Sequence, residues 1–310
     1  MPALRALVGT GFPPDLVVTA ADRRRGRGGA ATRSAVGAAA EVLGIPVLAT
    51  EDVNSARAVG ALHARRPDLL LVVAFGQILK KEVLDLPRIG ALNLHFSLLP
   101  RWRGAAPVQR ALEAGDAATG VTVQRIVARL DAGPVVAKRE TEIAADERAG
   151  ELEARLADIG AALLADVVAH AAETGTLIPG KPQDGAAVTT APKLRKEEGR
   201  ADFGASPRVF VRRARAFHPW PLVHAVLAAR DRSPVPVAIH RARVGDAKRS
   251  GPRKAGGTVL AAGRPGIEVA CGAGSVVLLE LQRPGAKVLP AAAFLNGLPV
   301  RPGDRLTAPR

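Results

Sequence analysis

The N-terminal third of the chain alternates short apolar runs with segments of helical periodicity. The runs at residues 15–20, 47–49 and 69–74 have the length and the β-branched or aliphatic content of buried strands. Between them, residues 32–43 and 53–65 carry apolar side chains at helical spacing. Strands that alternate with helices form a parallel sheet covered by those helices. This alternation predicts an α/β fold with a doubly wound sheet.

The later part of the chain continues this pattern and then changes it. Helical spacing returns at 106–114 and at 151–174, and an alternating strand covers 120–127, so we expect a first domain at 1–176. A Pro-, Gly-, Thr-, Lys- and Glu-rich linker should follow at 177–206. The second domain, 207–310, should contain a short helix at 207–216 and then apolar runs at 223–227, 235–240, 257–260, 267–270 and 275–281. Short strands with Gly and Pro turns predict a small β-barrel.

The segment NLHFSLLPRWRGAAP, residues 93–107, combines an amide, an imidazole, a hydroxyl and two guanidinium groups. It overlaps a short apolar run at 89–94, and strand alternation places Asn93 and His95 on one face at the end of that strand. Open α/β sheets bind ligands at the carboxyl ends of their strands. The alternative is a core histidine beside a capping asparagine. The polar neighbours favour an active site.

The charge of the chain suggests a polyanionic partner such as RNA. The formal net charge is +15 and the sequence pI is about 11.2. A compositional bias toward arginine and alanine would give the same excess without any ligand, so the position of the basic residues matters. We expect two basic loops. The first contains Arg23, Arg24, Arg25 and Arg27 near the N-terminus, and the second contains Lys248, Arg249, Arg253 and Lys254 within the barrel. The alternative for the second loop is an ordinary solvated surface without a ligand.

Cysteine and histidine usage gives no sign of a metal site. Cys271 is the single cysteine, which excludes an internal disulfide, and no two of the six histidines have i, i+4 spacing. No apolar stretch has membrane-spanning length, and Gly and Pro interrupt the N-terminus too early for a signal peptide. We therefore expect a cytoplasmic protein without metal or membrane contact.

Four blocks of sequence occur in order along nearly the whole chain: ADRRRGRGG, VVAFGQIL with NLHFSLLPRWRGAAPVQRAL, GVTVQRIVARLDAGPVV, and KLRKEEGRADF with RAFHPWP. Together they resemble the methionyl-tRNA formyltransferase family, whose members use 10-formyltetrahydrofolate. The resemblance implies a Rossmann-like formyltransferase domain followed by an OB-like tRNA-binding domain. It also implies transfer of a formyl group from 10-formyltetrahydrofolate to the amino group of methionyl-initiator-tRNA, for translation initiation.

The same resemblance implies roles for particular residues. The catalytic set would be Asn93, His95 and Asp131; Ser97, Leu98, Leu99 and Pro100 would bind folate; and Arg23, Arg24, Arg25 and Arg27 would contact the tRNA. The expected partners are initiator methionyl-tRNA and the folate co-substrate, and we expect a monomer. Without the resemblance, Asp131 would read as an ordinary turn residue. Arg101 and Arg103 either anchor the loop or contact the tRNA end or the folate glutamate.

The chemistry of formyl transfer needs residues of these types. Attack of a neutral amine on a formyl carbon develops negative charge on oxygen and positive charge on nitrogen, so the site needs a hydrogen-bond donor and a proton acceptor. Asn93 and His95 can donate, whereas Asp131 can pair with His95 and move the proton through a water.

The start of the chain departs from the family pattern. Family members begin with a strand and an FAGTP-like turn, whereas this chain begins within the helix that follows, with residues 4–8 as its remnant. A central strand would then be missing from the sheet, together with part of the folate pocket. We expect a start codon placed too late. An in-frame strand-coding segment in the upstream DNA would support this, and a stop codon there would exclude it.

Two other functions compete with this assignment. A related formyltransferase could act on a small amine, such as a sugar nucleotide or a purine precursor, but the arginine loop and the basic second domain favour tRNA. An inactive RNA-binding remnant that lacks the first strand is the other alternative. Formylation of charged initiator tRNA, transfer to a small amine, and binding without turnover distinguish the three.

Overall fold

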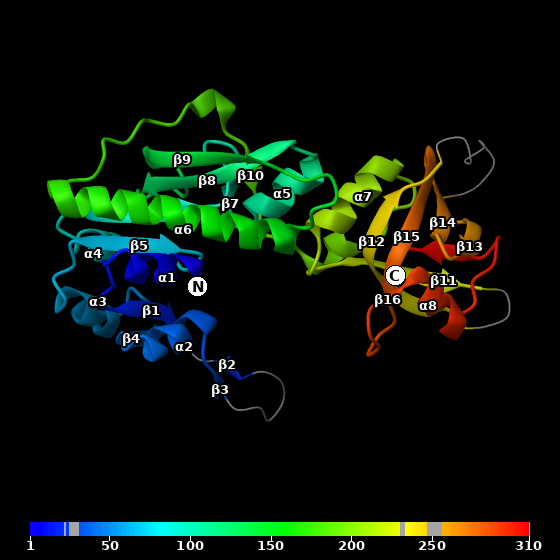
Figure 1. Ribbon diagram of the computed structural model, residues 1–310, viewed down its shortest axis with the longest axis horizontal. Helices are drawn as coiled ribbons and strands as arrows, with labels where there is room; N and C mark the ends of the chain where they lie inside the picture. The colour runs from blue at the N-terminus through cyan, green and yellow to red at the C-terminus, as the bar shows by residue number, and fades with distance from the viewer. Residues whose placement is uncertain (22, 25–30, 230–232, 247–255, 310) are drawn as a thin grey trace. The chain divides into compact units, whose positions relative to one another are not determined.

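The computed structural model describes residues 1–21, 23–24, 31–229, 233–246 and 256–309 (Figure 1). The chain forms two compact units. The first comprises Met1–Pro107, Ala118–Glu142 and Glu153–Ala191, and the second comprises Val108–Ala117, Ile143–Leu152 and Pro192–Arg310. Residues of the predicted linker therefore belong to both units, and the domain limits drawn from sequence stay predictions.

The first unit contains the expected alternation of strands and helices. Strand β1 (Val17–Ala20) pairs in parallel with β4 (Val47–Thr50), and β5 (Leu69–Val73) pairs in parallel with β6 (Gly90–His95). Helices α2 (Ala35–Val42) and α3 (Ala56–His63) lie between these strands in sequence, and serine hydroxyls cap both N-termini. Helix α1 (Pro2–Gly9) packs with α2 through Leu4 and Ala40. In the described part of the chain no strand joins β1 to β5.

Two antiparallel strands complete the larger sheet of this unit, whose order is β5-β6-β8-β9. Strand β8 (Ala118–Arg125) pairs with β6 and with β9 (Val135–Glu142), antiparallel in both cases. The sequence pattern did not predict this direction. A short connection joins β8 to β9, and only antiparallel neighbours can be joined in that way. Helix α6 (Ala149–Thr174) runs along the sheet (Figure 1), where a Cβ on Gly160 would lie 2.8 Å from the Leu94 side chain.

Several short elements were not predicted, because two to four residues carry too little periodicity to be recognised. In the first unit these are β2 (Arg23–Arg24), β3 (Ala31–Thr32), α4 (Lys81–Leu84), β7 (Arg103–Gly104), β10 (Thr190–Ala191) and the 3₁₀ turn η1 (Gly185–Ala187). Strands β2 and β3 pair with each other, and β7 pairs in parallel with β10. The predicted helix after the 93–107 segment is α5 (Pro107–Ala114).

The second unit is a curled antiparallel half-barrel, consistent with the OB-like domain expected from sequence. Its main strands follow the order β13-β14-β15-β12-β11-β17, and β16 pairs with β15. Their bounds are β11 (Val223–Ala228), β12 (Val235–Val244), β13 (Val259–Gly263), β14 (Gly266–Cys271), β15 (Gly274–Gln282), β16 (Leu289–Pro290) and β17 (Arg305–Thr307). The unit also contains η2 (Lys196–Gly199), α7 (Pro207–Ala216) and α8 (Ala291–Gly297).

The core of the second unit lies between α7 and the sheet. Helix α7 packs against β12 and β15 and buries Phe210, while Phe217 at its C-cap is fully buried. The rings of Phe203 and Phe210 stack with centroids 5.0 Å apart. Each buried phenylalanine contributes about 1.5–3 kcal/mol by leaving water. None of the helices in the described ranges is both long and apolar enough to cross a membrane.

Candidate active site

Asn93 and His95 lie on one face of β6, as strand alternation predicted, and both side chains approach the carboxylate of Asp131. The Nδ2 amide of Asn93 donates to Oδ1 of Asp131 over 3.5 Å, and Nδ1 of His95 lies 3.7 Å from Oδ2 of the same residue. The side chains of His95 and Asp131 are only 7% and 10% exposed, so water screens this pair weakly. The structure therefore brings together the three residues that the sequence assigned to catalysis.

Strands β6 and β8 present these groups by the ordinary alternation of a sheet. Leu92 and Leu94 are buried on one face of β6, which leaves Asn93 and His95 on the other. Directly across the ladder, Gln124 lies opposite Asn93 and Thr122 lies opposite His95. One face of the β6–β8 pair is thus polar, whereas the other face carries buried aliphatic side chains such as Leu92, Leu94 and Val123.

The carboxylate of Asp131 is held by three N–H donors. Oδ1 accepts from the side-chain amides of Asn93 and of Gln124, the latter at 3.0 Å, while Oδ2 accepts from the backbone N–H of Gly104 at 2.9 Å. Asp131 also has a left-handed backbone, with φ +48°. Asp131 therefore lies in a turn, as its sequence context predicts, and its carboxylate also receives three hydrogen bonds at the candidate site, where its catalytic role stays a prediction.

The imidazole of His95 has a defined orientation. Its Nε2 lies 2.9 Å from the carbonyl oxygen of Trp102. A carbonyl oxygen only accepts, so Nε2 carries a hydrogen in this contact. The nitrogen that faces the Asp131 carboxylate is then Nδ1.

The SLLP turn is built around a buried serine. The Ser97 hydroxyl donates to the Arg101 carbonyl oxygen at 2.6 Å, and the Thr122 hydroxyl donates to the Ser97 carbonyl oxygen at 2.7 Å. Ser97 and Leu99 are buried, whereas Leu98 and Pro100 are partly accessible. Of the four residues assigned to folate, Leu98 and Pro100 have the side chains that a ligand can reach.

The two arginines of the segment lie in different surroundings. The guanidinium of Arg103 donates through Nε and Nη2 to Oε1 of Gln183, at 3.0 and 2.7 Å. Burial, and then the positive charge of Arg129, lower the pKa of Arg103, while Asp131 acts in the opposite direction. Arg101 lies over the Trp102 ring, 5.3 Å from its centroid. For Arg103 these contacts favour the anchoring role.

Sequence reasoning missed three side chains at the site. Thr122 and Gln124 alternate with valines in GVTVQR, a pattern that could have identified a polar face on β8. Gln183 has no comparable signal, because it lies in a loop 52 residues from Asp131, whose carbonyl oxygen its amide contacts. Only the folded chain places it there.

The basic loops predicted from sequence lie only partly within the described residues. Arg23 and Arg24 form β2, whereas Arg25 and Arg27 lie outside the described residues. The second basic loop, with Lys248, Arg249, Arg253 and Lys254, also lies outside them. Within the described ranges, no group of three or more His, Cys, Asp or Glu side chains could hold a metal ion.

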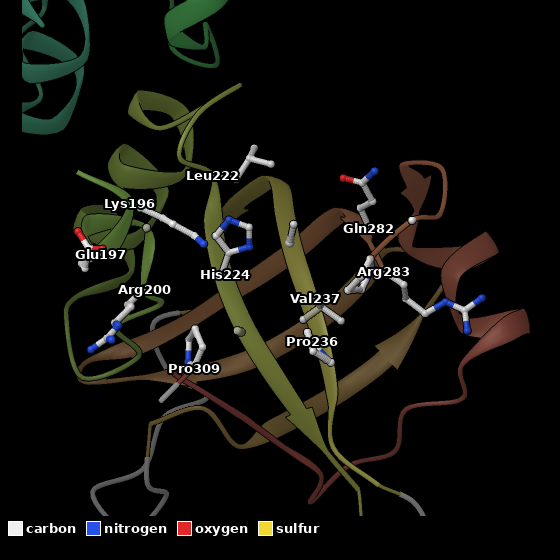
Figure 2. A pocket seen from close by; sticks show the side chains of 15 residues that line it. Lys196, Glu197, Arg200, Leu222, His224, Pro236, Val237, Gln282, Arg283 and Pro309 are labelled. Atoms are coloured by element: carbon white, nitrogen blue, oxygen red, sulfur yellow. The ribbon is translucent and has the colours of Figure 1, made fainter. Parts of the chain in front are cut away.

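A separate hollow of about 580 Å³ lies in the second unit (Figure 2). Leu222, Pro236 and Val237 give it apolar walls. Its charged side chains are Lys196, Glu197, Arg200 and Arg283, and it is also lined by His224 and Gln282. Three cations against one anion make the hollow a candidate contact for a polyanion.

Comparisons with known proteins agree with this geometry. Residues 15–168 match the formyl transferase family, and residues 193–299 match the formyl transferase C-terminal domain. A methionyl-tRNA formyltransferase of Pseudomonas paraeruginosa is 44% identical over 293 residues, which are 94% of this chain and 91% of that protein. One of Ralstonia nicotianae is 40% identical over 320 residues, with 99% and 94% covered. The solved structure of WlaRD, a sugar 3N-formyl transferase with dTDP and 5-N-formyl-THF, shares the fold at 13% identity, with a TM-score of 0.62 over 92% of this chain and 94% of that one.

Proposed function

The chain belongs to the methionyl-tRNA formyltransferase family, and we propose that it transfers the formyl group of 10-formyltetrahydrofolate to the amino group of methionine on initiator tRNA. The reaction supplies formylmethionyl-tRNA for translation initiation. The observation that carries this proposal is the convergence of Asn93, His95 and Asp131 at the carboxyl end of β6.

The residues present fit a formyl donor of this kind. Leu98 and Pro100 offer accessible apolar surface near the catalytic strand, which suits the ring system of a folate. Asn93 and His95 offer N–H groups for a carbonyl oxygen, and Asp131 offers a basic oxygen for the amine. When bound, 10-formyltetrahydrofolate supplies the electrophilic carbon and an amine leaving group.

Each of the three side chains has a different role in the proposed reaction. One N–H of Asn93 points to Asp131, and the second has no partner among the described residues, so it can donate to the formyl oxygen as negative charge develops there. His95 can donate to the same oxygen when Nε2 releases the Trp102 carbonyl. The Asp131 carboxylate accepts, through His95 or a water, the proton that the attacking amine must lose. That proton is then delivered to the folate nitrogen as its bond to the formyl carbon breaks, so that the leaving group departs as a neutral amine.

The tRNA contacts are proposed from charge. Arg23, Arg24, Arg25 and Arg27 are assigned to the phosphates near the acceptor end. Lys196, Arg200 and Arg283 around the hollow support a second contact in the OB-like unit. Replacing either set by alanine should weaken tRNA binding and flatten the dependence of log Kd on log salt concentration. An unchanged slope would remove that set from the interface.

The oligomeric state and location are also proposals. We propose a monomer, which is the state expected from the sequence, and a cytoplasmic location, because the substrates of the family are those of translation. Light scattering on the purified protein across its working concentrations tests whether the chain is a monomer. A mass twice that of the 32.1 kDa chain would contradict it.

A formylation assay tests the function itself. The full chain is incubated with 10-formyltetrahydrofolate and methionyl-initiator-tRNA, and formylmethionine is measured after release from the tRNA. Asn93→Ala and His95→Ala should each lower kcat about a hundredfold or more with tRNA affinity retained. Asn296→Ala and His63→Ala, at exposed helical positions, are matched controls. Transfer to a small amine alone would refute the proposal.

A further inference from the structure

Gln183 connects four groups around the catalytic turn. Its Nε2 donates to the carbonyl oxygens of Asp131 and Gly133, at 2.9 and 2.7 Å, and lies 3.2 Å from Oε1 of Gln124. Its Oε1 accepts two N–H groups from Arg103. One side chain thus links the 131–133 turn, strand β8 and strand β7.

The turn that Gln183 holds is conformationally demanding. Asp131 has a positive φ, which costs a non-glycine residue on the order of 1 kcal/mol unless its surroundings impose it. Gly133 has no room for a side chain, because a Cβ there would strike the Arg125 carbonyl oxygen. The backbone of this turn therefore depends on external partners, and Gln183 supplies hydrogen bonds to two of its carbonyls.

The segment that carries Gln183 is itself anchored. Lys181 exchanges two backbone hydrogen bonds with Val135, each 2.8 Å long. Gln183 is half-buried, although the residues beside it are largely exposed. The anchor sets the position of the amide relative to the start of β9, which follows the catalytic turn directly.

We propose that Gln183 is a positioning residue for formyl transfer, which acts by fixing the backbone of Asp131 and so the distance between its carboxylate and His95. It does not touch the reacting atoms. The inference rests on the proposed function, because it takes Asp131 as the catalytic carboxylate. It explains why an amide is needed, since the side chain must accept from a guanidinium and donate to carbonyls at once.

Two substitutions test the hydrogen bonds that Gln183 accepts separately from those that it donates. Gln183→Met keeps the length of the side chain but removes all its hydrogen bonds. Gln183→Glu keeps the acceptor for Arg103 but turns an oxygen toward the carbonyls of Asp131 and Gly133. Gln77→Met is the matched control, because Gln77 also bonds the backbone in the first unit, accepting from Val53 N–H at 2.8 Å.

The expected result is a loss in kcat with little change in KM. Displacing a catalytic group by a fraction of an ångström lowers the rate on the order of ten- to a hundredfold, so both Gln183 variants should lose that much kcat while KM for each substrate stays within about twofold. Gln77→Met should keep kcat. In parallel, amide hydrogen exchange should accelerate at residues 129–135 in the Gln183 variants but not in Gln77→Met.

The outcomes distinguish failure of the inference from failure of the function. If Asp131→Asn is inactive while Gln183→Met keeps wild-type kcat and slow exchange at 129–135, Gln183 has no positioning role. The same conclusion follows if both Gln183 variants lose no more activity than Gln77→Met. If the wild-type chain formylates no methionyl-tRNA, the proposed function fails, and hydrogen exchange alone decides whether Gln183 holds the turn.

Discussion

Replacement of Asp131 by asparagine should remove activity and also destabilise the first unit. The backbone N–H of Gly104 cannot rotate away, so the single oxygen of the asparagine must accept from it. The new NH₂ group then faces the amide of Gln124. Gln124 cannot relieve this by flipping, because its Oε1 faces Nε2 of Gln183 and a flip would set two NH₂ groups together. One buried donor stays unpaired, which costs about 1–3 kcal/mol.

The removal of a buried charge offsets part of that cost, so we expect Asp131→Asn to lower the free energy of unfolding by about 2 kcal/mol. Loss of the proton acceptor should lower kcat by about 10²–10⁴. Urea unfolding and steady-state formylation measure the two effects. Asp85→Asn is the control, since Asp85 is exposed and its carboxylate pairs, among the described residues, with Lys81 alone, one helical turn away. A kcat within about threefold of wild type would show Asp131 to be a turn residue alone.

Three further predictions follow from individual residues. Gly104→Ala should lower stability by about 1–3 kcal/mol in thermal unfolding, because φ is +129° and a Cβ would lie 2.5 Å from the Ala191 carbonyl oxygen. The control Gly9→Ala should leave stability unchanged, because Gly9 has open space around it. Cys271 is 3% exposed, and burial raises the pKa of its thiol to about 12. A thiol reagent at about pH 8 should therefore label Cys271 only after unfolding, and labelling of the native protein would contradict this. Burial is the main cause that lowers the pKa of His218 below 6.5 in the folded chain, followed by the charges of Arg148 and His240. The unfolded state therefore binds more protons, and stability should fall as the pH drops through about 6.5. In pH-dependent melting, His218→Asn should reduce that fall.

Local sequence pattern was enough to predict the longer strands and helices, and it placed Asn93 and His95 of the candidate site on one face. The strand–helix alternation predicted β1, α2, β4, α3 and β5, because each buries one apolar stripe or run that is readable from a few neighbouring residues. Asn93 and His95 followed from the same alternation on β6. Asp131 needed the family resemblance, because a turn aspartate gives no local sign that a histidine lies beside it. Gln183 could not be found, since its contacts are set by tertiary packing across many residues.

The site also shows why its residues should respond differently to replacement. Asp131 accepts from the N–H groups of three residues, so its carboxylate organises the site in addition to its proposed role in the chemistry. Asn93 donates one hydrogen bond to that carboxylate, and at 3.5 Å the bond is long. Losing Asn93 should therefore cost catalysis far more than stability, whereas losing Asp131 should cost both. A carboxylate that holds its neighbouring donors in place is what a site needs when charge develops on the substrate, because the protein then does not have to reorganise during the reaction.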